Sequence, residues 1–197
     1  MTRSAQNGVK FNRSNDQRER ELLQRIAAED REAMRELYLA YHRRLARFLA
    51  RLTARHEVVE EIINDTLVIV WQQADKFRAE SRVSTWIFGI AYRHGLKTLR
   101  AESRATRHMV APLPADAPAG DLIAERAELS DLLARASGTL SVEQRAVLAF
   151  TYVLGLSCEE IAVAMSCPVN TVKTRMFYAR QRLRTALPAL GARARET

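Results

Sequence analysis

The sequence has few residues that break, bend or crosslink a chain. It holds only seven Gly, five Pro and two Cys among its 197 residues. Two thiols cannot build a disulfide framework, and no CxxC pair or Cys/His cluster indicates zinc. No apolar run is long enough to span a bilayer, and the first twenty residues lack the apolar core of a signal peptide. Strand-like alternation is almost absent. These absences predict a cytoplasmic, all-α protein.

Catalytic motifs are also missing. The four histidines are not at metal-ligand spacing; they are His42, His56, His94 and His108. There is no P-loop, no G-x-S-x-G and no Rossmann glycine pattern. The sequence therefore predicts no enzyme and no cofactor. Most cysteines pack as small hydrophobes, but Cys158 lies in the first turn of an expected helix, where the dipole favours a thiolate if the side chain is exposed. Redox sensing by Cys158 or Cys167 stays open.

Positive charge is in excess. The 31 Lys and Arg outnumber the 23 Asp and Glu, so the formal net charge is +8. Long-range attraction and counterion release make such a protein favour polyanions, without saying which one. The hydrophobic fraction of 47% is high enough for folded domains.

Apolar residues at steps of three and four predict two helical domains. Residues 1–18 lack the pattern, and we expect a disordered leader there. The first domain is expected at 19–103, with one of its helices beginning near Ser84, a good N-cap residue. The stretch "RATRHMVAPLPADAPAGD" holds three of the five prolines, which predicts a flexible linker at 104–121. Helical periodicity resumes near Leu122, so we expect a second domain at 122–188 and a tail at 189–197.

The second domain carries clear helix-start signals. Ser141 with Gln144, and Ser157 with Glu160, form capping boxes. Gly155 is placed to end the helix before the second box. We therefore expect helices near 142–154, 158–165 and 169–187, with a turn at 166–168. A short helix, a tight turn and a longer basic helix is the order of a helix-turn-helix.

The last of these helices has two different sides. Its apolar stripe is expected to pack inward and consists of Val172, Met176, Ala179, Leu183 and Leu187. The opposite side carries cations, hydroxyls and Tyr178, which are the groups that contact phosphates and base edges. Residues 169–187 hold five cations and no anion. An ordinary solvated face mixes both signs, so we favour a DNA-reading helix over a merely solvated one.

The first domain contains two unlike surfaces. The segment "EVVEEIIND" at 57–65 is acidic and suits a basic protein surface rather than DNA. Residues 75–100 mix cations with Phe77, Trp86, Phe88 and Tyr92. Such a mixture can follow a nucleic-acid backbone and stack on unpaired bases. The alternative is that these aromatics are core residues, and we favour it for Trp71 and Trp86, which lie on apolar stripes.

Four segments together resemble the extracytoplasmic-function group of the bacterial RNA polymerase sigma factor family. They are "VEEIINDTLVIVWQQADKF", "STWIFGIAYRHGLKTLR", "LSVEQRAVLAFTYVLGLSCEEIAVAM" and "CPVNTVKTRMFYARQRLR". Residues 37–100 resemble sigma region two and residues 140–187 resemble region four. The resemblance implies two small helical domains, a region two bundle and a region four helix-turn-helix, joined by a flexible linker.

The resemblance also implies three sets of binding residues. The residues implied to bind core polymerase are Glu60, Glu61, Asn64 and Asp65. Those implied to capture the minus-ten element as a single strand are Arg78, Glu80, Ser81, Arg93 and Lys97. Those implied to read the minus-thirty-five duplex are Thr171, Lys173, Thr174, Arg175, Phe177, Tyr178 and Arg182. The chain departs from the common family pattern at four positions, namely Asn64, Ser166, Asn170 and Tyr178.

The expected function is therefore that of a sigma factor in a stress or envelope response. Its expected partners are core RNA polymerase, promoter DNA and an anti-sigma factor, without insertion into a membrane. The alternative is a stand-alone helix-turn-helix transcription regulator, which predicts a self-complementary apolar surface and palindromic operators. The acidic segment at 57–65 argues against that alternative.

Overall fold

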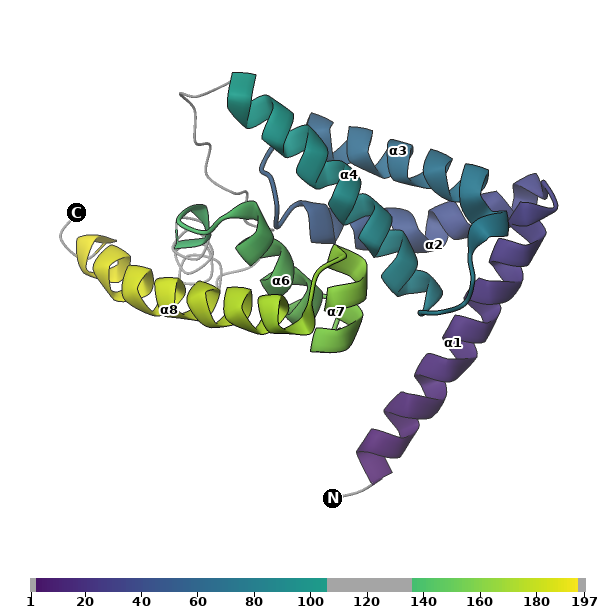
Figure 1. Cartoon of the computed structure of the whole chain (residues 1–197), viewed down its shortest axis with the longest axis horizontal. Helices are drawn as coiled ribbons and strands as arrows, with labels where there is room; N and C mark the ends of the chain where they lie inside the picture. Colours follow the sequence, from purple (N-terminus) through teal and green to yellow (C-terminus); the bar gives the residue numbers. More distant parts are fainter. Residues whose placement is uncertain (1–2, 106–135, 195–197) are drawn as a thin grey trace, which may run out of the picture.

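The computed structural model describes residues 3–105 and 136–194. Every regular element in these two ranges is helical, which confirms the all-α prediction (Figure 1). The elements are α1 (Arg3–Ala27), α2 (Arg31–Leu49), α3 (His56–Gln73), the 3-10 turn η1 (Ala74–Lys76), α4 (Val83–Ala105), α6 (Val142–Tyr152), α7 (Cys158–Met165) and α8 (Val169–Ala194). We call residues 3–105 the first half and residues 136–194 the second half.

Several predicted boundaries can be compared with these elements. The expected linker at 104–121 begins inside α4, and its remainder from residue 106 lies outside the described residues, as does 122–135. The expected tail at 189–197 begins inside α8, which continues to Ala194. None of the helices in the described ranges combines the length and apolar character needed to cross a bilayer.

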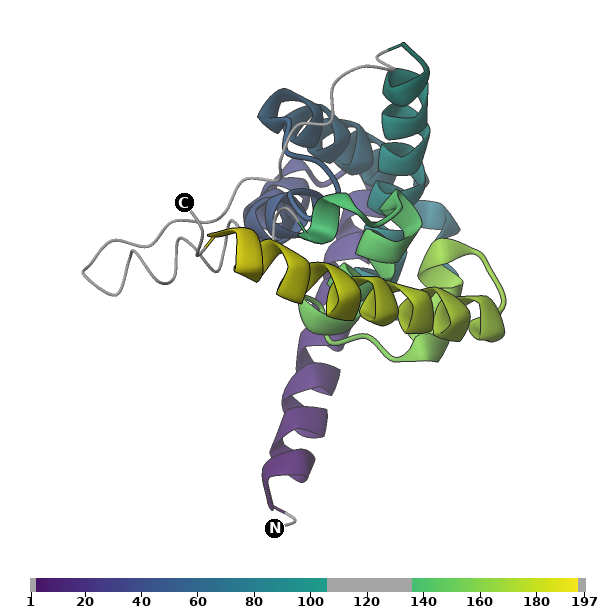
Figure 2. The same ribbon diagram turned by 90° about the vertical axis from the view of Figure 1, so that its left-hand side faces the viewer.

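Helix α1 covers most of the segment expected as a leader at 1–18. It begins at Arg3, and its far end stands away from the other helices in both views (Figures 1 and 2). This segment lacks the apolar periodicity on which the prediction relied, but it has polar pairs one turn apart. Asn15 donates to Glu19 at 2.8 Å and Arg20 donates to Asp16 at 2.9 Å. Pairs with this spacing stabilise a helix that few apolar contacts support.

The corner between α1 and α2 is fixed by a side-chain cap. Asp30 accepts hydrogen bonds from the amides of Glu32 and Ala33 at 2.9 and 3.1 Å. These bonds, together with the guanidinium of Arg25 at 2.8 Å, hold the pKa of the Asp30 carboxyl below its usual range. The cap satisfies amides that otherwise lack partners in the first turn of α2. Helices α2, α3 and α4 then form a bundle against which the C-terminal part of α1 packs.

The second half is the predicted helix-turn-helix. Both capping boxes are present, with Ser141 and Gln144 starting α6 and Ser157 and Glu160 starting α7. Gly155 adopts a φ of 66°, as expected for the residue that ends the first of these helices. Ser166 caps the end of α7 with a left-handed backbone, at φ 50°. Val172, Met176 and Ala179 are buried, and Leu183 and Leu187 are half-buried, so the apolar stripe of α8 faces inward as predicted.

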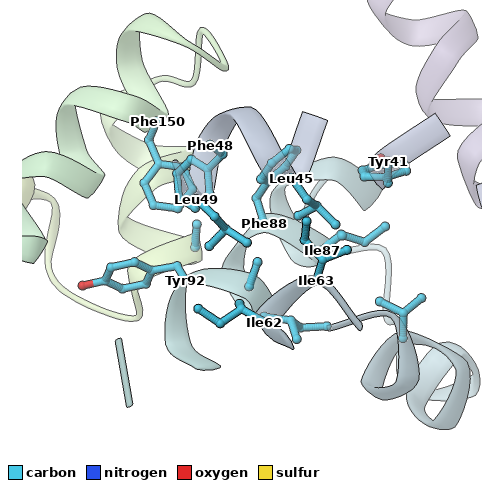
Figure 3. Packing of buried hydrophobic residues seen from close by; sticks show 14 of the residues in the cluster. Tyr41, Leu45, Phe48, Leu49, Ile62, Ile63, Ile87, Phe88, Tyr92 and Phe150 are labelled. Carbon is cyan, nitrogen blue, oxygen red and sulfur yellow. The ribbon is translucent and has the colours of Figure 1, made fainter. Parts of the chain in front are cut away.

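The two halves share one hydrophobic core. Phe150 of α6 lies with its ring centroid 4.7 Å from that of Phe48 and 5.8 Å from that of Tyr92 (Figure 3). Helix α4 also packs directly against α7. A Cβ added to Gly89 would lie 3.1 Å from the carbonyl oxygen of Ala164, so glycine permits this close approach of two backbones.

Candidate functional site

The four residues expected to bind polymerase lie on one side of α3. Glu60, Glu61, Asn64 and Asp65 follow helical spacing, while Ile62 and Ile63 of the same helix are fully buried. Glu61 and Asn64 are exposed, and Glu60 and Asp65 are partly exposed. We call these four residues the acidic face. The structure thus brings them together as a surface that a partner can reach.

Histidines hold two of the three carboxylates of the acidic face. His94 Nε2 lies 2.7 Å from Asp65 Oδ2. His42 Nε2 lies 3.1 Å from Glu60 Oε2, and His56 Nδ1 lies 3.8 Å from Glu60 Oε1. These contacts restrict the rotamers of both acids. The pairs with His42 and His94 join residues 18 and 29 positions apart, which no local pattern could have indicated.

The segment from 77 to 82 joins η1 to α4, and we call it the capture loop. It carries three of the residues expected to bind the minus-ten strand. Arg78 and Glu80 are exposed and Ser81 is half-buried. At the start of the loop Phe77 packs on Trp86, with 5.3 Å between ring centroids. Ala79 adopts a φ of 55°, a left-handed conformation that is strained for a residue with a side chain.

The aromatic residues of α4 do not form a stacking surface in this structure. Phe88 is 1% exposed and Tyr92 is 2% exposed. Burial raises the pKa of the Tyr92 hydroxyl to about 12. Trp71 and Trp86 are partly buried against the core, in agreement with the preference for a core role. The possibility that Phe88 and Tyr92 stack on bases is therefore not supported by their position.

The cations of α4, and Arg82 just before it, divide between solvent and the second half. Lys97 is exposed. The guanidinium of Arg93 donates to the carbonyl oxygen of Ala164 at 3.1 Å, and desolvation lowers its pKa. Arg82 Nε lies 3.3 Å from Glu160 Oε1, and Arg100 lies 2.6 Å from Glu143. One expected minus-ten contact, Arg93, is thus engaged by the helix-turn-helix.

The outer side of α8 presents the residues expected to read duplex DNA. Lys173 and Thr174 are exposed and Thr171 is half-buried. Phe177 and Tyr178 are 64% and 51% exposed, with their rings 5.5 Å apart in an edge arrangement. Two neighbouring aromatic rings left in water at this level are unusual on a helix whose other side is packed. Their exposure indicates a contact surface.

Two arginines expected at phosphates make contacts within the chain. Arg175 lies 3.7 Å from the sulfur of Cys167, and Arg182 donates to the carbonyl oxygen of Thr139 at 3.2 Å. Arg180, for which the sequence pattern predicts no role, donates to the hydroxyl of Tyr152 at 2.9 Å. These bonds tie α8 to the residues that precede it in the second half.

Asp16 is a further residue that the sequence analysis missed. Its carboxylate accepts a hydrogen bond from the amide of Val83, the first residue of α4, at 3.2 Å. Ser84 was the expected cap of this helix, but it lies within the first turn, because the amide of Trp86 already bonds to the carbonyl oxygen of Arg82. The polar composition of 1–18 gave no signal that one of its acids reaches α4.

The remaining reactive side chains form no further site in the part of the chain that the structure describes. Both cysteines are free and half-buried against the core. No group of three or more His, Cys, Asp and Glu residues in the described ranges could hold a metal ion.

Comparison with protein families gives two matches in chain order. The family profile described as Sigma-70 region 2 matches residues 37–105, and the one described as Sigma-70, region 4 matches residues 130–183. The first match contains the acidic face, the capture loop and α4. The second contains the helix-turn-helix and the exposed aromatic pair on α8. Helix α1 lies outside both.

Two curated relatives extend the likeness over most of the chain. The ECF RNA polymerase sigma factor SigM of Mycobacterium tuberculosis is 35% identical over 176 residues, which cover 89% of this chain and 87% of the relative. The ECF RNA polymerase sigma-E factor of Haemophilus influenzae is 25% identical over 182 residues, covering 86% and 95% of the two chains.

Two solved structures have similar folds. The sigma factor RpoE of Bartonella quintana, solved in complex with the anti-sigma factor NepR, has a TM-score of 0.59 at 26% identity; the match covers 78% of this chain and 96% of that one. CnrH, solved in complex with the cytosolic domain of CnrY, has a TM-score of 0.64 at 23% identity, with coverage of 87% and 97%; at this identity it supports the fold alone.

Proposed function

Because this chain belongs to the extracytoplasmic-function group of RNA polymerase sigma factors, which direct promoter-specific transcription initiation, we propose a role for each of its surfaces. The acidic face of α3 binds core polymerase. The capture loop and α4 bind the opened minus-ten strand, and α8 reads the minus-thirty-five duplex. The sigma factor relatives favour this function over a stand-alone helix-turn-helix regulator.

One observation carries the assignment of the two kinds of surface. The chain combines an acidic helix face and an exposed basic, aromatic helix, which require partners of opposite charge. Glu61 and Asn64 are exposed on α3, whereas Lys173, Phe177 and Tyr178 are exposed on α8. DNA would repel the first surface and attract the second. A protein partner for α3 and a DNA partner for α8 meet the charge requirements of both surfaces.

The proposed mechanism contains no covalent step and no cofactor. Opening the duplex costs a few kcal/mol for each unstacked base, and a captured base offsets part of that cost. Two weak DNA contacts on one chain also reinforce each other through effective concentration. Polymerase then holds both parts of the sigma factor on one promoter. We place this activity in the cytoplasm, where the bacterial polymerase works.

The described arrangement is closed, and we propose that it opens on polymerase. The minus-ten and minus-thirty-five elements are roughly 25 base pairs apart, or about 85 Å along straight B-DNA at 3.4 Å per pair. In the closed arrangement α4 and α7 touch, and Arg93 is bonded to Ala164. One chain in this arrangement cannot reach both elements. The halves therefore separate when the promoter is bound.

An anti-sigma factor is the partner we propose for the closed form. The similar RpoE structure of Bartonella quintana was solved with the anti-sigma factor NepR. A partner that covers exposed apolar side chains and bridges the halves would keep Arg93 away from DNA. Loss of that partner under stress would release the sigma factor. This regulation explains how a chain with surfaces for polymerase can be kept inactive.

The test is run-off transcription with purified core polymerase on a library of promoter fragments. We expect specific initiation only when this protein is added. Glu61→Lys reverses one exposed charge of the acidic face and should weaken core binding about tenfold to a hundredfold. Lys173→Ala should leave core binding unchanged and weaken promoter binding at every sequence.

Glu57→Lys is the matched control for the first variant. Glu57 is exposed in the first turn of α3 but lies outside the four residues of the acidic face. An equal loss of core binding in both variants would mean that general charge, not this face, attracts polymerase. Promoter binding without any need for polymerase, and with no initiation, would overturn the proposed function.

A further inference from the structure

Asp16 links two elements that are distant in sequence. It lies on α1, whereas its hydrogen-bond partner, the amide of Val83, is 67 residues away at the start of α4. Its second carboxylate oxygen accepts from Arg20 Nε at 2.9 Å, which orients the group. Asp16 is mostly buried, with 18% of its side chain exposed. A carboxylate here also faces the positive end of the α4 dipole.

The capture loop cannot cap α4 by itself. The residue at the cap position is Arg82, whose carbonyl oxygen accepts the first helical bond from Trp86. An arginine side chain has no acceptor to offer to the free amides. The hydroxyl of Ser81 points to the carbonyl oxygen of Arg82 at 3.3 Å, not to an amide. The amide of Val83 is therefore satisfied by Asp16 from outside the loop.

The contact also determines where the capture loop ends. At its start the loop is anchored by Phe77 on Trp86. At its end it is anchored by Asp16 on Val83. Between these anchors Ala79 is held at a φ of 55°, which an unrestrained alanine seldom adopts. Two fixed ends on so short a segment keep the loop in this strained form, with Arg78 and Glu80 facing solvent.

We propose that Asp16 is a positioning residue for minus-ten recognition, acting through the amide of Val83. In this role α1 is part of the strand-capturing surface, although it lies outside the matched region 2 at 37–105. The inference rests on the proposed assignment of the capture loop to the minus-ten strand. Asp16 itself does not touch DNA. It holds Arg78, Glu80 and Ser81 in the arrangement that receives an unstacked base.

The experiment uses polymerase holoenzyme assembled with the full chain. The probe is a single-stranded oligonucleotide that wild-type holoenzyme selects from a random pool. We expect Asp16→Ala to weaken binding of this probe about threefold to tenfold, in keeping with the loss of one helix cap. Affinity for core polymerase should not change. Asp16→Asn keeps the acceptor oxygen and should restore binding to within about twofold of wild type.

A second capping residue gives the control for stability alone. Asp30→Ala removes the cap of α2, far from the capture loop in sequence, and should lower the melting temperature about as much as Asp16→Ala does. It should bind the probe like wild type. If Asp16→Ala binds like wild type, or Asp30→Ala loses as much binding, Asp16 has no positioning role.

The wild-type protein separates this inference from the proposed function. If wild-type holoenzyme selects no oligonucleotide and initiates nowhere, the assignment of the capture loop fails, and the role of Asp16 fails with it. If wild type selects a strand and only the role of Asp16 fails, the assignment of the loop stands. A loss in Asp16→Ala that Asp16→Asn repairs supports both.

Discussion

The first half and the second half of this protein fix their binding surfaces by different means. In the second half the starts of α6 and α7 are each set by a residue three positions away, as in Ser157 with Glu160. In the first half α2 is also capped locally by Asp30, but the cap of α4 and the contacts of the acidic face come from other helices. Asp16 bonds to Val83, and His94 bonds to Asp65. The two helices that precede α8 thus begin through local contacts, whereas the strand-capturing surface and the acidic face are held by long-range ones.

This difference has a functional meaning. A helix that enters a DNA groove needs only to be rigid and to have its opposite face packed against the rest of its domain. A loop that captures a base needs both ends fixed from outside, because its own residues are occupied with the ligand. Long-range contacts provide that support, but they also connect the surface to the rest of the fold. Three changes would break or sharpen the comparison.

The largest loss of unfolding free energy should come from Phe150→Ala. Phe150 is fully buried between Phe48 and Tyr92 of the first half. Removing a buried phenyl ring costs about 3–5 kcal/mol of unfolding free energy, through lost transfer free energy and the cavity left behind. Chemical denaturation followed by circular dichroism would measure it. Val163→Ala, at a 56% exposed position of α7, is the control and should change stability by less than about 0.5 kcal/mol.

A loss below about 1 kcal/mol for Phe150→Ala would contradict a shared core. The halves would then be independent domains that merely touch. A loss confined to the unfolding of the second half would lead to the same conclusion, because Phe48 and Tyr92 would not depend on Phe150.

Gly89→Ala is expected to have a smaller effect, which is selective for the contact between the two halves. The added Cβ would meet the backbone of Ala164 at 3.1 and 3.2 Å, and backbone cannot give way as a side chain does. Alanine is also the better helix former by about 1 kcal/mol, so α4 itself should remain intact. We expect the contact between α4 and α7 to loosen, and the fraction of molecules whose halves have separated to rise. Small-angle scattering of the free protein would then show a larger radius of gyration than for wild type.

Gly95→Ala is the matched control on the same helix. Its Cβ would lie 3.3 Å from the end of the Ile62 side chain, inside the first half, where a small rotation makes room. Its scattering curve should match that of wild type. The same change in both variants would indicate general disturbance of α4, and unchanged scattering in Gly89→Ala would show that the close approach does not hold the halves together.

The smallest loss of stability is expected from a pair of variants that distinguish a local helix cap from a long-range one. Ser157→Ala removes the hydroxyl that accepts from the amide of Glu160, and should cost about 1 kcal/mol. Ser84→Ala should cost less than about 0.5 kcal/mol, because α4 is capped by Asp16 and alanine favours the helix interior. Thermal unfolding of both variants would measure the difference. Equal losses would mean that Ser84 contributes to the start of α4 after all.

The sequence predicted the second half well because its signals are local. The capping boxes at Ser141 and Ser157 and the apolar stripe from Val172 are confirmed in position. It predicted the first half less well. The N-terminal part of α1 was not among the expected helices, since polar pairs one turn apart leave no apolar pattern. Ser84 was expected as a cap, although the acceptor comes from a residue that pattern reading cannot connect to α4.

The candidate site likewise contains features that local sequence signals predict and features that depend on distant residues. The clustering of Glu60, Glu61, Asn64 and Asp65 was predictable from helical spacing on α3. The histidines that hold Glu60 and Asp65 were not, because only the packing of α2 and α4 against α3 brings them close. The bond from Arg93 to Ala164 was equally hidden, since it depends on how the two halves meet. The binding roles of these residues stay predictions.

The shared core also sets an order of events during synthesis. The ribosome makes Phe48 first, and its aromatic partner Phe150 follows roughly 100 residues later. At about 5–20 residues per second this is a delay of about 5–20 s. Once Ala105 has been made, the first half can fold during the rest of this delay, but the side that Phe150 covers faces water or another protein. A nascent chain of this sigma factor therefore passes through a stage in which its first half is folded but the surface that Phe150 covers is still exposed.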